Sequence, residues 1–335
     1  MVCRIAIIGD GAWATVCGVM LSENGNAVRI WSPFPQAAED LRRTRQNGRY
    51  LPGVRLPDEI EVTGEDDCAM KDADIVLHAV PAQYARGVWR RLAGRYRPGT
   101  PICSVVKGVE NRTLLRPTQV LADVLGTATG PLAALSGPSI APEVAQKLPA
   151  TVTVASDDQA FAETIQARIS RPYFRVYTNS DLPGVELAGA TKNVVAIAAG
   201  ILDGLSAGSN AKAALLTRGL VEITRLGLAM GAKAETFAGL AGMGDLVTTC
   251  ISPLGRNRSF GEAVGRGATV EQAVKSFAPA VVEGVATAAS VVELADKMHI
   301  EMPITRAVYD VVFAGRSSKT AIVELMTRPL KAEGC

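Results

Sequence analysis

The 335-residue sequence contains only two histidines, and its six cysteines lack the paired Cys-x-x-Cys spacing that zinc sites use. A structural zinc needs several Cys or His ligands that the chain can bring close together. We therefore predict neither a metal centre nor a disulfide framework. We assign no catalytic role to His78, His299 or Cys250.

A strong charge of one sign is also missing, since 35 Lys and Arg oppose 33 Asp and Glu for a formal net charge of +2. Such a balance creates no long-range field that would attract nucleic acid or an anionic membrane. We find no apolar run of the roughly 20 residues that a membrane span needs, and no signal peptide. We expect a cytoplasmic protein without a nucleic-acid partner or a membrane span.

The length suggests two domains, because a domain usually has about 100 to 200 residues. In the first half, short apolar runs alternate with helical patterns, which is typical of parallel strands joined by crossover helices. The strand-like runs are residues 5–8, 27–31, 75–80, 102–106, 133–136, 151–155 and 174–177. Beyond residue 181 apolar residues recur at helical spacing. We predict a mostly parallel α/β sheet domain over residues 1–180 and an all-helical domain over residues 181–335.

A glycine-rich turn follows the first predicted strand, where residues 9–14 read Gly-Asp-Gly-Ala-Trp-Ala and open a helix. Gly9 allows a tight turn, and Gly11 lets the backbone approach a pyrophosphate whose charge the helix N-terminus stabilises. Ala14 stands in place of the third glycine of this motif, a position that mainly needs a small side chain. The first domain is therefore predicted to be Rossmann-like and to bind a dinucleotide.

The choice between NAD and NADP stays open. The second strand runs into Ser32 and Pro33 without the Asp or Glu that hydrogen-bonds the adenosine ribose of NAD. This absence leaves room for the 2′-phosphate of NADP, but residues 30–34 offer no arginine to bind it. The arginines at 42, 43 and 45 are expected on a solvated helix face.

Two lysines stand at positions that suit chemistry. Lys107 follows the predicted strand 102–106, at the carboxyl edge where open parallel sheets bind ligands, although a surface lysine would also fit there. Lys192 interrupts an otherwise apolar helix, where burial would lower its pKa from about 10.4 toward 7 or 8 and make it a usable general base. The alternative is a lysine that extends from the edge of the helix to solvent.

Further polar residues follow strand ends or glycine-rich segments. Gly137 and Ser139 follow a predicted strand, where the glycine would bring backbone close to a ligand or simply mark a loop. Asp245 ends a glycine-rich segment and reads either as a helix N-cap or as a site carboxylate. Arg256 and Asn257 would offer donors to a phosphate unless they belong to a solvated basic loop.

Six segments, read with the glycine-rich turn, resemble the bacterial NAD(P)-dependent glycerol-3-phosphate dehydrogenase family. They are Val-Lys-Gly-Val-Glu at 106–110, Leu-Ser-Gly-Pro-Ser at 135–139, Ala-Thr-Lys-Asn-Val at 190–194, Gly-Leu-Ala-Gly-Met-Gly-Asp-Leu at 239–246, Gly-Arg-Asn-Arg-Ser-Phe-Gly at 255–261 and Val-Glu-Gly at 282–284. They keep the family's order over nearly the whole chain. Departures from the family pattern are Ala12, Ala14, Pro33 and Gly255, the last of which stands where serine usually precedes the Arg-Asn pair.

The resemblance implies reversible hydride transfer between NAD(P)H and dihydroxyacetone phosphate to give sn-glycerol 3-phosphate, which feeds glycerophospholipid synthesis. It implies that Lys192 is the general acid and base, and that the enzyme is a possible homodimer. The substrate-binding residues that it implies are Lys107, Gly137, Ser139, Lys192, Asp245, Arg256 and Asn257. The cofactor-binding residues that it implies, with those of the glycine-rich turn, are Gly9, Gly11, Ala12, Trp13, Lys107, Ala141, Arg256, Val281 and Glu283.

Two other functions compete with this interpretation. A dehydrogenase of a 3-hydroxy acid or of ketopantoate would share the architecture, but a carboxylate substrate would not need Arg256 and Asn257 as a phosphate anchor. A non-catalytic nicotinamide-binding sensor would not need Lys192 and Asp245.

Overall fold

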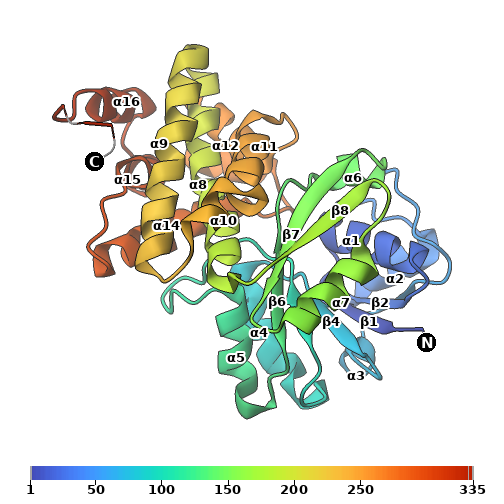
Figure 1. Cartoon of the computed structure of the whole chain (residues 1–335). Coiled ribbons are helices and arrows are strands. Elements are labelled where there is room, and N and C mark those ends of the chain that lie inside the picture. The colour runs from blue at the N-terminus through green and yellow to red at the C-terminus, as the bar shows by residue number, and fades with distance from the viewer. Residues whose placement is uncertain (1, 331, 334–335) are drawn as a thin grey trace.

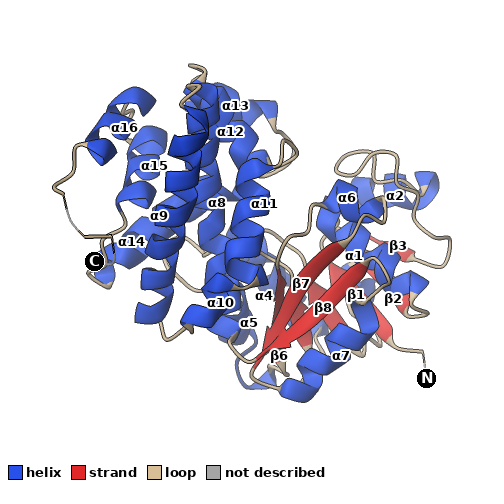
Figure 2. Cartoon of the chain, turned by 45° about the horizontal axis from the view of Figure 1, so that its top comes forward, coloured by secondary structure: helices blue, strands red, loops and turns tan. Residues whose placement is uncertain are grey.

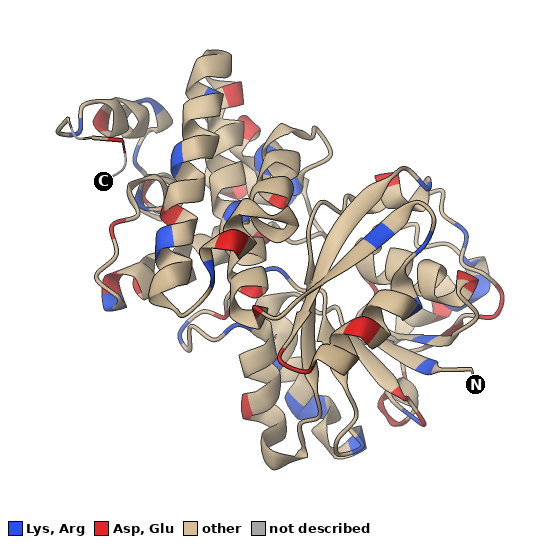
Figure 3. Cartoon of the chain, viewed as in Figure 1, with Lys and Arg blue, Asp and Glu red and all other residues tan. Residues whose placement is uncertain are grey.

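The computed structural model describes residues 2–330, 332 and 333 of the chain. Figure 1 shows a sheet-containing part built from the first half of the chain beside a helical part built from the second. Basic and acidic residues are interspersed over both parts in the view of Figure 3. Five of the six cysteines are free thiols, and Cys335 lies outside the described residues.

The described residues form one eight-stranded sheet with the order β3-β2-β1-β4-β5-β6-β7-β8 (Figure 2). Neighbouring strands from β3 to β6 are parallel, β7 runs antiparallel to β6, and β8 is parallel to β7. The strands are β1 (Arg4–Ile8), β2 (Ala27–Trp31), β3 (Glu61–Thr63), β4 (Ile75–His78), β5 (Ile102–Ser104), β6 (Leu132–Ser136), β7 (Ala150–Ser156) and β8 (Phe174–Asn179). The predicted mostly parallel sheet is confirmed, and β3 is a strand that the sequence analysis missed.

Helices cover both faces of the middle of this sheet, so strands such as β1 and β4 are buried on both sides, as expected for parallel strands, whereas β8 alternates buried and exposed residues. In β1, Ile5 and Ile7 enter one hydrophobic cluster whereas Ala6 and Ile8 enter another. This alternation follows from the two-residue period of a strand. The helices and turns of this part are α1 (Ala12–Glu23), α2 (Pro35–Thr44), α3 (Asp66–Ala69), α4 (Ala82–Leu92), η1 (Ala93–Arg95), α5 (Pro117–Leu125), η2 (Gly126–Ala128), α6 (Ala141–Ala145) and α7 (Gln159–Ile169).

The second half of the described chain is helical, as predicted, and is arranged around α8 (Leu182–Gly204). The others are α9 (Gly208–Ala229), α10 (Ala234–Ala238), η3 (Leu240–Gly244), α11 (Asp245–Ile251), α12 (Arg256–Gly265), α13 (Val270–Ser276), α14 (Glu283–Lys297), α15 (Pro303–Phe313) and α16 (Ser318–Met326). Long helices such as α8 and α9 lie side by side in Figure 1.

Helix α8 corrects one expectation, because it is long and apolar enough to cross a membrane by length and composition. The sequence analysis found no such run, since Glu186 and Lys192 interrupt it. Its most apolar 18-residue window is 94% buried inside the protein. Helix α8 is therefore the core helix of the helical part.

Glycines let α12 pack directly against α8. A Cβ added to Gly200 would lie 1.9 Å from the carbonyl oxygen of Arg258, and one added to Gly261 would lie 2.0 Å from that of Ile197. Side chains cannot be inserted at such distances, so the two backbones are in contact. This contact fixes the N-terminus of α12, which carries two of the predicted site residues, beside the middle of α8.

Candidate active site

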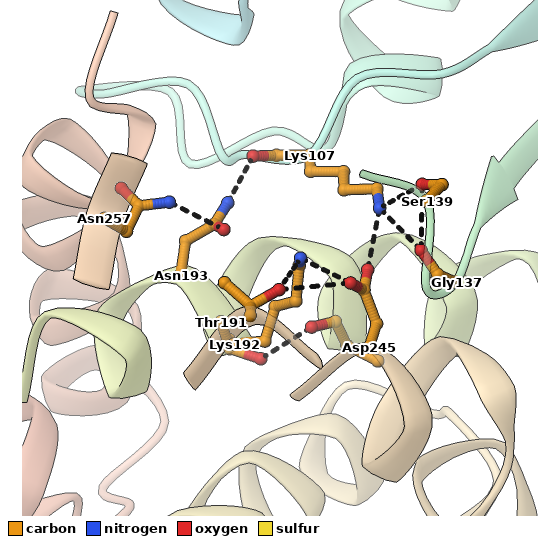
Figure 4. Close-up of polar contacts among 10 residues, drawn as sticks. Lys107, Gly137, Ser139, Thr191, Lys192, Asn193, Asp245 and Asn257 are labelled. Carbon is orange, nitrogen blue, oxygen red and sulfur yellow. Dashed lines mark hydrogen bonds and ion pairs between the residues drawn. The ribbon is translucent and has the colours of Figure 1, made fainter. Parts of the chain in front are cut away.

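A cluster of polar side chains lies where the carboxyl ends of β5 and β6 meet α8 and α11 (Figure 4). Lys107, on the loop after β5, donates hydrogen bonds to the Gly137 carbonyl (3.0 Å) and the Ser139 hydroxyl (3.3 Å) on the loop after β6. Its Nζ also lies 2.7 Å from Oδ2 of Asp245. Three predicted substrate-binding residues therefore converge on Lys107.

Asp245, the first residue of α11, lies between two ammonium groups. Its Oδ1 accepts a hydrogen bond of 2.6 Å from Lys192, and its Oδ2 accepts the bond from Lys107. Burial by itself would raise the pKa of the Asp245 carboxyl, but the two lysines outweigh burial and lower that pKa below its usual value. Asp245 is therefore a buried, ionised group that orients both lysines.

The pKa of Lys192 is lowered, as its place on an apolar helix predicted. The residue is only 5% exposed, and burial lowers its pKa to about 8, an effect that Asp245 opposes and Lys107 reinforces. Its Nζ also hydrogen-bonds the hydroxyl of Thr249, which in turn donates to Oδ1 of Asp245 at 3.2 Å. Such an amine can take up and release a proton near neutral pH, as general acid and base catalysis requires.

Two glycines allow this cluster to form. Gly137 has a φ of +136°, and an added Cβ would lie 2.9 Å from the backbone of Val152, so only glycine can aim this carbonyl at Lys107. A Cβ on Gly189 of α8 would lie 2.6 Å from the Ser136 hydroxyl and 3.5 Å from Cγ of Lys107. The absence of that side chain lets the end of β6 and the Lys107 loop approach α8.

A chain of amides joins this cluster to the N-termini of α12 and α14. Asn193 donates to the Lys107 carbonyl (3.1 Å), Asn257 donates to the Asn193 side chain (2.9 Å), and the Gly284 N–H donates to Asn257 (2.9 Å). Asn257 is thus buried and held on both sides. The amide chain therefore ties together the Lys107 loop, α8, α12 and α14.

Arg256, next to the buried Asn257, has a guanidinium group that is free to bind an anion. Its side chain is exposed and, within the described part of the chain, it forms no ion pair, whereas Arg258 pairs with Asp203 and Glu262. The N-cap residue of α12, Gly255, provides no side-chain cap, and its own N–H is used by the Ser252 carbonyl. The first N–H groups of α12 beyond Gly255 form no hydrogen bond within the described residues, and such groups at a helix N-terminus are suited to bind an anion.

The turn between β1 and α1 fits a dinucleotide. Gly9 has a φ of +120°, and a Cβ there would lie 2.8 Å from the Ala79 carbonyl oxygen, whereas nothing lies within 4 Å of a Cβ added to Gly11. The N-terminus of α1 has no side-chain cap, which leaves its first N–H groups and open space for a pyrophosphate. The indole N–H of Trp13 is buried without a partner among the described residues.

The other predicted cofactor-binding residues lie at or next to the first residues of three helices. Ala12 and Ala141 begin α1 and α6, Val281 precedes α14, and Glu283 begins α14. Burial raises the pKa of the Glu283 carboxyl, and Arg256, Lys107 and Lys192 act in the opposite direction. The charges of Glu283 and of the lysine cluster therefore influence one another.

Two of the three residues to which we assigned no role, His78 and Cys250, are buried and inert in the structure. Burial lowers the pKa of His78 to about 3, and the ring accepts a hydrogen bond of 3.1 Å from Trp89. Burial raises the pKa of the Cys250 thiol to about 12. Neither group changes its protonation near neutral pH.

Two family models match the chain. The model of the NAD-dependent glycerol-3-phosphate dehydrogenase N-terminus matches residues 4–162, and the model of its C-terminus matches residues 181–323. The chain belongs to this family. A curated glycerol-3-phosphate dehydrogenase (NAD(P)+) of Corynebacterium glutamicum is 44% identical over 98% of this chain and 99% of its own length. The glycerol-3-phosphate dehydrogenase of Citrifermentans bemidjiense is 45% identical over 99% of both chains.

Solved structures agree with this glycerol-3-phosphate dehydrogenase family membership. The crystal structure of glycerol-3-phosphate dehydrogenase from Coxiella burnetii superposes with a TM-score of 0.94 at 38% identity, covering 98% of this chain and 99% of that one. A ketopantoate reductase from Ralstonia eutropha reaches a TM-score of 0.60 at 15% identity and covers 95% of this chain and 99% of its own. That second likeness concerns the fold alone.

The sequence analysis missed the contacts that Thr249 and Asn193 make in this site. Thr249 lies one helical turn after Asp245, and this spacing of four residues was the available signal. Asn193 was named only as part of the segment 190–194. Its contacts with Lys107 and Asn257 span 86 and 64 residues of sequence, so no local pattern predicts them.

Proposed function

We propose that this chain reduces dihydroxyacetone phosphate to sn-glycerol 3-phosphate with NAD(P)H, reversibly, and that Lys192 is its general acid and base. One observation carries the proposal: Lys192 is buried at the carboxyl edge of the sheet and has a pKa of about 8. Burial lowers this pKa, and the bond to Asp245 partly opposes that effect. Open parallel sheets bind their ligands at this edge.

The proton would move through Nζ of Lys192. In reduction, the ammonium donates a proton to the carbonyl oxygen at C2 as a hydride reaches C2, and Lys192 becomes a neutral amine. In oxidation, the neutral amine takes the proton of the C2 hydroxyl. The nicotinamide supplies or accepts the hydride when bound. Asp245 and Thr249 orient Nζ throughout, which limits the cost of bringing it to the reacting oxygen.

Substrate binding is assigned to the groups around this amine. Lys107, Gly137 and Ser139 border the reacting end, and Arg256 with Asn257 anchors the phosphate at the N-terminus of α12. The usual serine contact at Gly255 would be replaced by backbone N–H groups of α12 and not by the Gly255 N–H, which is already used by Ser252. A phosphate dianion is well matched to a guanidinium beside a helix N-terminus.

Cofactor binding is assigned to the first domain, proposed at residues 1–180, and substrate binding mainly to the second, at 181–335. The proposed cofactor contacts are Gly9, Gly11, Ala12, Trp13, Lys107, Ala141, Arg256, Val281 and Glu283. We further infer a cytoplasmic location, a possible homodimer, and a role in supplying glycerophospholipid synthesis.

An absorbance assay of nicotinamide oxidation tests the function. We expect turnover with dihydroxyacetone phosphate and little with unphosphorylated dihydroxyacetone, because Arg256 and α12 then have no anion to bind. Faster turnover of ketopantoate or a 3-oxo acid would favour the first alternative. Tight cofactor binding without turnover of dihydroxyacetone phosphate would favour the sensor.

A further inference from the structure

An acidic side chain lies at the end of β2 although the sequence of β2 supplies none. The strand ends at Trp31 and continues into Ser32, where dinucleotide-binding folds that use NAD carry an Asp or Glu. Asp10, the residue between the two glycines of the turn after β1, reaches this place. The Ser32 hydroxyl donates a hydrogen bond of 2.7 Å to its Oδ2.

The register of the sheet explains why the turn and the strand end meet. Ile8 of β1 is paired with Trp31 of β2, and the N–H of Gly9 donates to the Trp31 carbonyl at 2.9 Å. Asp10 therefore comes two residues after the last paired position of β1, beside Ser32. The adenosine ribose of a dinucleotide bound at this turn lies at the end of the second strand.

Asp10 is held in position by its neighbours. Its carbonyl accepts a hydrogen bond of 2.7 Å from Asn47, which also donates to Thr15 at 2.8 Å, and the Ser32 hydroxyl accepts one of 3.1 Å from the Phe34 N–H. The side chain is only half-buried. Among the described residues, no side chain besides Ser32 donates to its carboxylate, which leaves acceptor capacity for a ligand.

Two arginines near the end of β2 lie over aromatic rings. The Arg49 guanidinium lies over the rings of Phe34, at 5.4 Å, and Tyr50, at 5.1 Å. Within the described residues Arg49 forms no ion pair, although its charge opposes the effect of burial, which raises the pKa of the Asp10 carboxyl. The Arg91 guanidinium likewise lies over the ring of Trp31, the last residue of β2, at 5.3 Å. Both arginines at this strand end thus stack on aromatic rings, and Asp10 is a carboxylate there that forms no ion pair within the described residues.

We propose that Asp10 replaces the missing acidic residue of β2, binds the adenosine ribose hydroxyls, and makes the enzyme select NAD(H) over NADP(H). The proposal rests on the proposed function only in that the turn must bind a nicotinamide dinucleotide. A carboxylate accepts hydrogen bonds from the 2′-hydroxyl of NAD but repels the dianionic 2′-phosphate of NADP.

Direct binding measures this selectivity without turnover. Dissociation constants of NADH and NADPH are obtained by calorimetric or fluorescence titration of wild type, Asp10→Asn and Asp10→Ala. We expect wild type to bind NADH at least about tenfold more tightly, because a hydrogen bond to a charged group changes affinity by roughly this factor or more. Asp10→Asn should bind NADPH about tenfold better, and Asp10→Ala should also lose about tenfold for NADH.

Two further variants complete the test. Asp74→Asn removes the same charge at the opposite edge of the sheet, where Asp74 pairs with Arg4, and should leave both constants unchanged. Ser32→Ala removes the hydroxyl that holds the Asp10 carboxylate at the end of β2, so the carboxylate loses its fixed position and the ratio should shift in the same direction as in Asp10→Asn but less. If the Asp10 variants do not fold, Ser32→Ala alone still tests whether the Asp10 carboxylate sets the ratio of the two dissociation constants.

The outcomes separate the two proposals. A wild type that prefers NADPH, or a ratio of the two constants that Asp10→Asn and Ser32→Ala leave unchanged, would overturn the assignment of Asp10. Normal dinucleotide binding without turnover of dihydroxyacetone phosphate would instead overturn the proposed function and leave the role of Asp10 standing.

Discussion

Replacing Lys192 by alanine is expected to lower kcat by about a hundredfold to ten-thousandfold, the usual contribution of a positioned acid or base. This loss corresponds to about 3 to 5 kcal/mol of transition-state stabilisation. The structure indicates that the loss comes from chemistry and not from collapse of the site. Asp245 keeps its bond of 2.7 Å to Lys107 and that of 3.2 Å from Thr249, so its carboxylate is not left unpaired.

Steady-state assays with dihydroxyacetone phosphate give kcat, and fluorescence titration gives the dissociation constant of the dinucleotide. The second quantity should change little, because Lys192 lies on α8 and the glycine turn that binds the pyrophosphate lies between β1 and α1. Lys275→Ala is a suitable control, since Lys275 is exposed on α13 and pairs only with Glu271. It should retain full activity.

The reasoning about Lys192 would be refuted by a Lys192→Ala enzyme whose kcat stays within a factor of about ten of wild type, a smaller effect than loss of a general acid or base produces. A large increase in the dinucleotide dissociation constant would also contradict it, because the residue would then act through cofactor binding. Circular dichroism of the variant establishes that its fold is retained before either conclusion is drawn.

Three other predictions concern pH, anion binding and packing. The kcat/KM for oxidation of glycerol 3-phosphate should rise with pH through about 8 as Lys192 becomes neutral, and the kcat/KM for reduction should fall over the same range. Flat pH profiles would exclude Lys192 as the titrating group. Arg256→Ala should raise KM for dihydroxyacetone phosphate far more than it lowers kcat, and an unchanged KM would remove the phosphate anchor. Gly261→Ala places a Cβ 2.0 Å from a carbonyl of α8 and should lower the free energy of unfolding by about 1 to 3 kcal/mol in denaturant titration. Gly87→Ala, on the exposed face of α4 with open space around it, should not destabilise the protein.

The sequence was sufficient for most of the sheet because its parallel strands are apolar on both faces. Residues 75–78 show this, since all four are buried. Strand β3 was missed because only Val62 of its three residues is buried, which leaves no periodic signal. The reversed direction of β7 also has no local signature, since direction depends on how the connection from β6 is packed.

For the site, single residues could be predicted but their partnerships could not. Lys192 was identified because burial of a charged lysine on an apolar helix is unfavourable unless another group pairs with it. Its bond to Asp245 spans 53 residues, and the bond from Lys107 to Asp245 spans 138. Asp10 was overlooked for a related reason: the search for an acidic residue was confined to β2, whereas the acid comes from the turn after the neighbouring strand.

The lysine cluster also explains how a buried amine can release its proton beside a carboxylate. If Asp245 were paired with Lys192 alone, loss of the proton would leave a buried charge without a partner, and the pKa of Lys192 would stay high. Lys107 removes this difficulty, because it remains paired with Asp245 in both protonation states of Lys192. Its own positive charge further lowers the pKa of Lys192. The cluster thus alternates between one net positive charge and none, and the neutral state retains a complete ion pair.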